Sequence, residues 1–199
     1  LPVAVTSLTE VGFHQASYKW ALAIETPLPD ANMDAARGKG TGRDLTAQAS
    51  GEDSVLSGSV LRMWRSRPGK PNTAIDVGAE PGTTVLAPVT GRVVRVRAYD
   101  LYGKYPDFEV HIQPEGRPEV DCVLIHIENP TVAAGDTVIA GVTSVGSVRR
   151  LSDRITMQLA EYTKGNGDHI HIQLNDATDP TYKGLEGVTE MVAPAQDDH

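Results

Sequence analysis

Residues 84–97 read TVLAPVTGRVVRVR, and this stretch sets the pattern for most of the chain. Two apolar runs lie on either side of Pro88 and Gly91, which are residue types that favour turns. In the second run, valines alternate with arginines from Val94 to Arg97. Alternation with a period of two is typical of a strand that packs one face inward. The stretch therefore predicts short strands separated by tight turns.

The same pattern continues through the second half of the chain. Two apolar runs, 108–112 and 122–127, flank a segment with Pro and Gly and predict a hairpin. Further strands are expected at 137–140, 144–148 and 169–174. Short strands with turn residues between them predict a mainly β fold, an antiparallel β-sandwich or a barrel-like sheet.

The N-terminal quarter differs in composition. A moderately apolar stretch that includes residues 18–24 predicts one strand, whereas residues 27–53 are rich in Pro, Gly, Asp, Ala and Thr and predict a long flexible loop. We therefore expect an irregular N-terminal extension over 1–54, a β domain over 55–190 and a tail over 191–199. Residues 151–162 fit a strand or a helix, and periodicity does not decide between them.

Composition excludes several classes of protein. A length of 199 residues suits one domain, or one domain with an extension. The net charge of −8 argues against a general nucleic-acid binder. A single cysteine, Cys122, excludes an internal disulfide and a cysteine-based zinc cluster, and most simply predicts a small buried side chain. No apolar run approaches the roughly 18 residues of a membrane span.

His169-Ile170-His171 is the first group that could carry chemistry. In a strand, positions i and i+2 point to the same face, about 6.5–7 Å apart. Two imidazoles, which are common zinc ligands, would then share one surface. On this motif alone, the alternative to metal binding is that both histidines simply lie on the solvent-facing side of a strand.

Other segments raise the significance of that pair. They occur in a fixed order along the chain: NTAIDVG at 72–78, PGTTVLAP at 81–88, His126 near the end of a strand, GDTVIAG at 135–141, HIH at 169–171 and Asp179-Pro180. Together, over residues 72–180, they resemble the M23 family of zinc metallopeptidases of the lysostaphin or LytM type.

The resemblance implies a small antiparallel β fold with a groove and a zinc site on its floor. By position, Asp76 and His171 would be metal ligands, and His126 and His169 the catalytic pair beside the metal. In such a site a metal-bound water attacks a peptide carbonyl, assisted by the neighbouring histidines. The resemblance further implies peptides of bacterial peptidoglycan as substrates and an extracytoplasmic location. Because the sequence begins at Leu1 and not Met, we also expect a processed product, with any signal peptide or membrane anchor outside this sequence.

One departure from the family pattern concerns the metal. Asn72 stands where the family has its first ligand histidine. An amide oxygen binds zinc poorly compared with imidazole, and a catalytic zinc normally has three protein ligands. Zinc binding is therefore expected to be weakened or absent. The missing ligand could also come from water, from Asn72 itself, from a rearranged His126 or His169, or from His14 of the extension.

Two other segments depart from the pattern. Residues 151–164 look inserted before the HIH motif, where they would rim the groove, and the usual F-G-x-R stretch is not recognisable at 61–67. His111 alternates with apolar neighbours and is expected at the surface or on a groove wall.

Three functional hypotheses follow. The first is a catalytically degenerate M23-like domain that binds peptidoglycan peptides or regulates a cell-wall hydrolase. The second is an active zinc endopeptidase that cleaves peptidoglycan cross-link peptides. The third, remote alternative is a biotinyl or lipoyl carrier domain, for which Lys104 is the only lysine between the relevant segments, without the expected neighbours.

Overall fold

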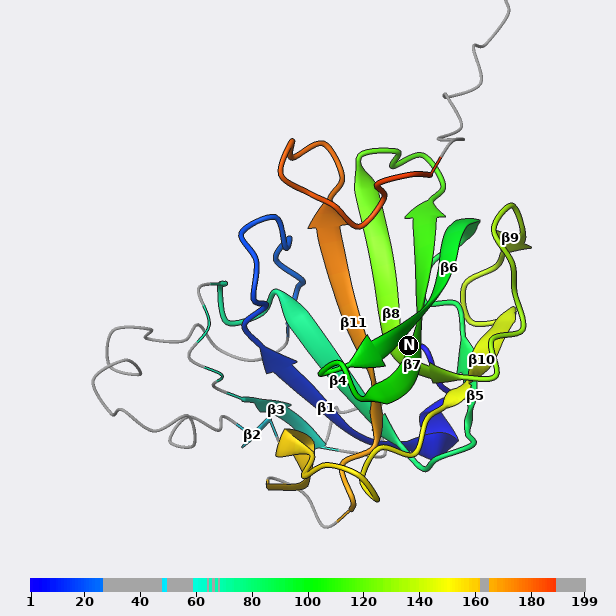
Figure 1. The fold of residues 1–199 in the computed structure, drawn as a ribbon. Helices are drawn as coiled ribbons and strands as arrows, with labels where there is room; N and C mark the ends of the chain where they lie inside the picture. Colours follow the sequence, from blue (N-terminus) through cyan, green and yellow to red (C-terminus); the bar gives the residue numbers. More distant parts are fainter. Residues whose placement is uncertain are drawn as a thin grey trace, which may run out of the picture.

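A computed structural model describes residues 1–26, 48–49, 59–63, 65, 67, 69–161 and 165–188. The tail expected over 191–199 lies outside these residues, as does the loop expected over 27–53 except for residues 48–49. The described chain forms one twisted, curved sheet of 11 strands with almost no helix (Figure 1). The prediction of a mainly antiparallel β fold is confirmed.

The elements follow one another in this order along the chain: η1 (Val5–Ser7), β1 (Leu8–His14), β2 (Gln48–Ala49), β3 (Ser59–Arg62), β4 (Ala74–Ala79), β5 (Thr84–Leu86), β6 (Gly91–Leu101), β7 (Tyr105–Pro114), β8 (Val120–Glu128), β9 (Thr137–Val138), β10 (Ser144–Val148), η2 (Gln158–Glu161) and β11 (His169–Asp176). Their order across the sheet is β2-β3-β1-β4-β11-β8-β7-β6-β9, and β10 pairs with β5 and β8. β1 and β3 are parallel, whereas the other pairings are antiparallel.

Most strands lie where the sequence predicts them. The 108–112 and 122–127 runs form the centres of the hairpin partners β7 and β8, and the HIH motif begins β11. Of residues 151–162, the structure describes 151–161, and these adopt neither of the predicted structures over their length. They form turns and then the short 3₁₀ helix η2, while Leu151, Met157 and Leu159 are buried.

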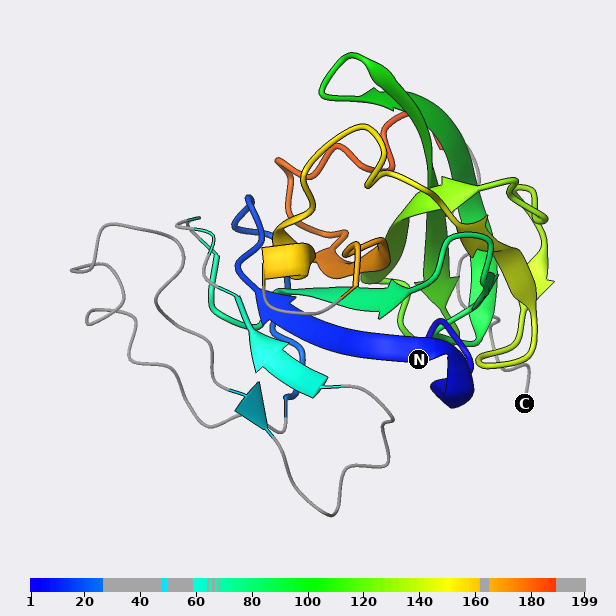
Figure 2. The ribbon, with the colours of Figure 1, turned by 90° about the horizontal axis from the view of Figure 1, so that it is seen from below.

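The N-terminal strand is not the predicted one. Residues 18–24 contain only an isolated bridge between Ala21 and Asn175, and the strand is Leu8–His14. β1 lies between β3 and β4, as Figure 2 shows, so part of the expected extension belongs to the same sheet. The reason is packing, because β1 buries Leu8, Val11 and Phe13 in the main core.

The two faces of the sheet differ in chemistry. Residues of one face form the main apolar core, among them Val77, Val110, Ile112, Leu124, Ile170 and Ile172. Successive side chains of a strand point to opposite faces. The intervening residues of β4, β7, β8 and β11 therefore gather on the other face, where they form buried polar clusters: Asp76, Asp107, Glu109, His111, Asp121, His169 and His171. None of the described helices is long and apolar enough to cross a membrane.

Candidate metal centre and adjoining cavity

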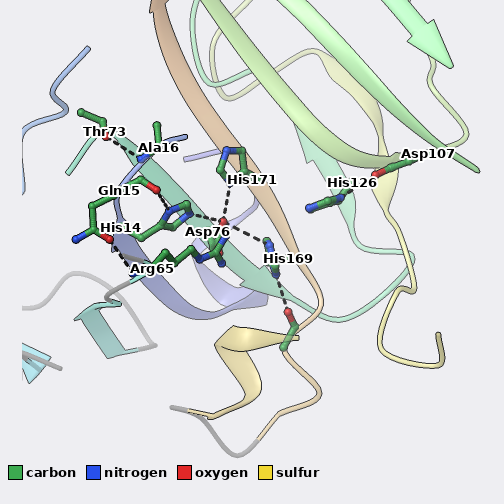
Figure 3. Close-up of polar contacts among 11 residues, drawn as sticks. His14, Gln15, Ala16, Arg65, Thr73, Asp76, Asp107, His126, His169 and His171 are labelled. Carbon is green, nitrogen blue, oxygen red and sulfur yellow. Dashed lines mark hydrogen bonds and ion pairs between the residues drawn. The ribbon is translucent and has the colours of Figure 1, made fainter. Parts of the chain in front are cut away.

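Asp76 is the centre of one polar cluster. It lies on β4, in register with Gly12 of β1 and His171 of β11, and its side chain is fully buried. Its Oδ1 atom lies 2.8 Å from His171 Nδ1, 3.1 Å from His14 Nε2 and 3.4 Å from His169 Nε2 (Figure 3). The two strands that flank β4 thus direct three imidazoles at one carboxylate oxygen, one from β1 and two from β11.

Three of these residues could hold a metal ion. The ligand atoms of His14, Asp76 and His171 all lie within 4.8 Å of one another, and all three residues are buried. Two imidazoles and one carboxylate are the donor types of many catalytic zinc sites. The motif predicted Asp76 and His171, whereas His14 is one of the sources considered for the missing ligand.

The hydrogen bonds of the histidines test whether a cation fits. His14 Nδ1 lies 2.8 Å from the carbonyl oxygen of Gln15, and His169 Nδ1 lies 2.7 Å from that of Gly167. A carbonyl only accepts, so each Nδ1 carries the proton and donates it. In the neutral imidazoles, both Nε2 lone pairs then face the carboxylate of Asp76. Acceptors that face one another need a positive centre between them, and a metal ion fits this arrangement.

The turn before β11 holds His169 in place. Gly167 has a φ of 78°, a conformation that favours glycine. A Cβ atom at this position would lie 2.6 Å from the backbone nitrogen of Ala160. Glycine therefore allows the turn to pass close to η2 while its carbonyl accepts the His169 proton.

Asn72 is not brought into this cluster. Its side-chain amide donates to the carbonyl oxygen of Ile24, which lies in the segment after the isolated bridge. The imidazole that takes its place comes from His14 on β1, which precedes Asp76 by 62 residues in the sequence. Motif spacing contains no signal for this residue, since the pairing of β1 with β4 is what brings it to the site.

Electrostatics keep the donor atoms in metal-binding states. Burial opposes the ionisation of Asp76, but the Arg65 guanidinium, which donates to its Oδ2, and the nearby histidines hold the pKa of Asp76 well below its usual range. Burial lowers the pKa of His169 to about 4 and that of His171 to about 3. At neutral pH the carboxylate is therefore ionised and these two imidazoles are neutral, as metal ligation requires.

His126 lies beside the cluster and is oriented by a second carboxylate. The pairing of β7 with β8 shifts register at this point, and His126 has a φ of 68°, which is uncommon for a residue with a side chain. Its Nδ1 lies 2.8 Å from Asp107 Oδ2. Its ring makes an edge contact with that of His169, with 5.2 Å between centroids. Backbone strain of this kind is concentrated at functional sites.

A cavity of about 440 Å³ opens against this pair of histidines. The described residues that line it are Arg65, Arg67, Leu101, Tyr102, His126, Ile155, Thr156, Met157, Gln158 and His169. Four of them belong to the 151–164 segment, which the sequence predicted to rim the groove. The cavity places solvent-accessible space next to the two predicted catalytic histidines.

His111 does not lie where the sequence predicted. It is 2% exposed, and its ring is held between Asp121 and Glu109 at 2.7 and 2.8 Å. The alternation of His111 with its apolar neighbours correctly predicted the polar face of β7, but other residues cover that face at this position. Tyr182, which contacts Asp121, contributes to the cover. Cys122 is buried, as predicted.

No protein-family model and no curated protein matches the chain. Among solved structures, the chain is similar to a variant of the catalytic domain of the prophage-encoded M23 protein EnpA from Enterococcus faecalis, at 19% identity and a TM-score of 0.38, over 79% of this chain and 87% of that one. It is similar to the deep-sea M23 metalloprotease pseudoalterin at 20% identity and a TM-score of 0.37, over 55% and 58% of the two chains. A chain of the SpoIIQ–SpoIIIAH pore-forming complex follows, at 16% identity and a TM-score of 0.36, over 89% and 82%.

Proposed function

We propose that this chain is an M23-like, zinc-dependent peptide hydrolase in which His14 takes the role that Asn72 has lost. The observation that carries the proposal is the convergence of His14, Asp76 and His171 within 4.8 Å of one another. This group of residues would supply the three protein ligands of a catalytic zinc site. The order of sequence motifs from 72 to 180 supports the M23-like assignment.

The residues around the cluster have distinct roles in this proposal. Zinc, when bound, acidifies a water molecule and polarises a carbonyl oxygen. Asp107 accepts the Nδ1 proton of His126, which fixes the tautomer and leaves Nε2 to take up or deliver a proton. Tyr99 also donates to Asp107, with 2.8 Å between the oxygens, and helps to hold that carboxylate in place. His126 is therefore the general base or acid of the proposed reaction.

His169 and Arg65 position other groups. His169 contacts both Asp76 and the ring of His126, and in this position it can polarise a substrate oxygen or a water molecule. Arg65 binds Oδ2 of Asp76 and leaves Oδ1 directed at the imidazoles. A carboxylate held in this way would present one oxygen to a metal.

We propose peptides of bacterial peptidoglycan as the substrates and an extracytoplasmic location. Both rest on the motif resemblance. The cavity beside His126 and His169 supplies room for a peptide.

A non-catalytic role is the second candidate, and Arg65 favours it. Its guanidinium already neutralises the carboxylate on which zinc binding would depend. In that case the domain would bind peptidoglycan peptides, or regulate a cell-wall hydrolase, without cutting. The carrier hypothesis has less support, because it does not account for the histidines gathered around Asp76.

Zinc content and peptide hydrolysis test the two candidates. We expect protein purified without chelator to contain about one zinc per chain and to release new amino groups from purified peptidoglycan. His126→Ala should lower the rate by about 10²–10⁴-fold while zinc content is unchanged. Asn72→Ala is the matched control and should retain activity.

The outcomes separate the candidates. Stoichiometric zinc without hydrolysis by the unmodified chain would favour the binding role. If hydrolysis persists after zinc is removed with a chelator, the metal-dependent mechanism is wrong.

A further inference from the structure

The charged residues that line the cavity beside His126 are positive, although the protein as a whole is acidic. The chain as a whole has a net charge of −8. Nevertheless, the described residues that line the cavity include two arginines, Arg65 and Arg67, and no carboxylate. A cavity lined by one sign of charge concentrates ligands of the opposite sign.

The two arginines are not equivalent. Arg65 is paired with Asp76, so their charges cancel. Within the described part of the chain, no ion pair joins Arg67 to a carboxylate. Counting Arg65, Arg67 and Asp76 together, these three groups carry one net positive charge at the cavity wall.

Arg67 is also partly removed from water. Its side chain is half-buried, and this burial together with the charge of Arg65 lowers the pKa of Arg67. A partly desolvated guanidinium gains more from a paired anion than a fully hydrated one does. Its planar arrangement of N–H groups matches the two oxygens of a carboxylate.

The lining of the cavity also includes an exposed aromatic side chain. Tyr102 and Gly103 form the tight turn between β6 and β7, with φ values of 55° and 67°. Tyr102 is 78% exposed and lines the cavity. A left-handed conformation is strained for so large a residue, and such strain persists at ligand-binding positions. The ring can pack against a chain that enters the cavity.

We propose that the cavity binds an acidic peptide and that Arg67 pairs with a carboxylate of this peptide, next to the bond presented to His126. The inference rests on the proposed function for the identification of the ligand as a peptide. It adds a specificity-determining residue, Arg67, and a substrate class, peptides with a free carboxylate close to the cleaved bond.

Binding of paired peptides tests the inference. The probes are fluorescently labelled hexapeptides of Ala and Gly in which one Glu is placed at each position in turn, each with a Gln counterpart. Fluorescence anisotropy is measured with zinc-supplemented protein. We expect at least one Glu peptide to bind about 10- to 100-fold more tightly than its Gln counterpart, as for hydrogen bonds to charged groups.

Substitutions assign this preference to Arg67. In Arg67→Gln the Glu and Gln peptides should bind alike, while zinc affinity is unchanged. Arg67→Lys should keep part of the preference, because the charge remains. Arg117→Gln removes the same charge from an exposed ion pair with Glu119 and should leave the preference intact. Thermal unfolding of each variant verifies that it is folded.

The results distinguish this inference from the proposed function. Equal affinity for Glu and Gln at every position, or a preference that survives in Arg67→Gln, would overturn the carboxylate site. A preference that depends on Arg67, without hydrolysis of any peptide, supports the carboxylate site and contradicts the hydrolase. Hydrolysis at the same rate for the Glu and Gln peptides would support the hydrolase and contradict the carboxylate site.

Discussion

Two buried clusters on the polar face of the sheet are built from the same residue types. The first, which we call the Asp76 cluster, contains His14, Asp76, His169 and His171. The second, the His111 cluster, contains Glu109, His111, Asp121 and Tyr182. Both place histidine against carboxylate in the interior, yet only the first has the geometry of a metal site.

In the His111 cluster, donors and acceptors match. The two ring nitrogens of His111 face two different carboxylates, so a doubly protonated imidazole donates to both. Burial opposes the charge on His111, but the hydrogen bonds to Asp121 and Glu109 raise its pKa to about 9. Burial likewise opposes the charge on Glu109, whose pKa is lowered to about 2 by His111 and Arg97.

In the Asp76 cluster, donors and acceptors do not match. Backbone carbonyls take the Nδ1 protons of His14 and His169, so the Nε2 lone pairs of these two rings, when neutral, face the carboxylate of Asp76, whereas His171 Nδ1 can donate to it. The comparison shows that residue type does not separate a structural cluster from a binding site. What separates the two is the group to which each imidazole donates its proton.

The largest expected effect is on stability, from His111→Ala. This substitution leaves two buried carboxylates without their shared cation, which typically costs about 3–5 kcal/mol. His126→Ala is the matched control, because Asp107 retains its hydrogen bonds from Tyr99 and from the backbone of Phe108. Urea unfolding measures both. Equal losses in the two variants would mean that the His111 cluster is not the structural one.

A second prediction separates the clusters by zinc affinity. His14→Ala should weaken zinc binding by at least about 100-fold, since losing even an outer-sphere partner costs about 10–100-fold. His111→Ala should leave the affinity unchanged in protein that remains folded. Competition with a chromogenic chelator measures both values. A His14→Ala protein that binds zinc normally would remove His14 from the ligand set.

The pH dependence of stability gives a third test. The pKa of His111 is raised from 6.5 to about 9 on folding, so its stabilising contribution is fully present below pH 6.5 and is lost as the pH rises through about 9. The groups that face it are the carboxyl groups of Glu109 and Asp121. Between pH 6.5 and 9.5, the free energy of unfolding should fall by an amount on the order of 3 kcal/mol.

The same variant provides the control for this titration. In His111→Ala this part of the pH dependence should be absent. A decline of the same size in both proteins would assign it to other groups.

The smallest expected effect is that of Asn72→His. The family pattern alone predicts that a histidine here would restore a ligand and raise zinc affinity. In the structure His14 already supplies an imidazole, and the Asn72 side chain is directed to the carbonyl of Ile24. We therefore expect a gain of less than about tenfold, below the usual effect of an outer-sphere partner. A larger gain would show that residue 72 faces the metal.

The sequence by itself determined the strands and much of the site. Alternation and turn residues predicted β6, β7 and β8, which pair with their neighbours in sequence, and also β11, which buries one face although its partners β4 and β8 are distant in sequence. Motif order singled out Asp76, His126, His169 and His171, which the structure brings to one region. These four residues came from the resemblance to the M23 motif order, whereas periodicity alone indicated only that His169 and His171 share one face of a strand.

Only the tertiary structure decided the contribution of His14 and the burial of His111. β1 joins the sheet through pairing with β3 and β4, which no local pattern encodes, and that pairing brings an imidazole across 62 residues to Asp76. Similarly, alternation placed His111 on the polar face, but the carboxylates and the tyrosine that enclose it come from β7, β8 and the segment after β11. Contacts between distant segments therefore determine that the polar residues of the His111 cluster hydrogen-bond to one another and that those of the Asp76 cluster surround a position suited to a metal ion.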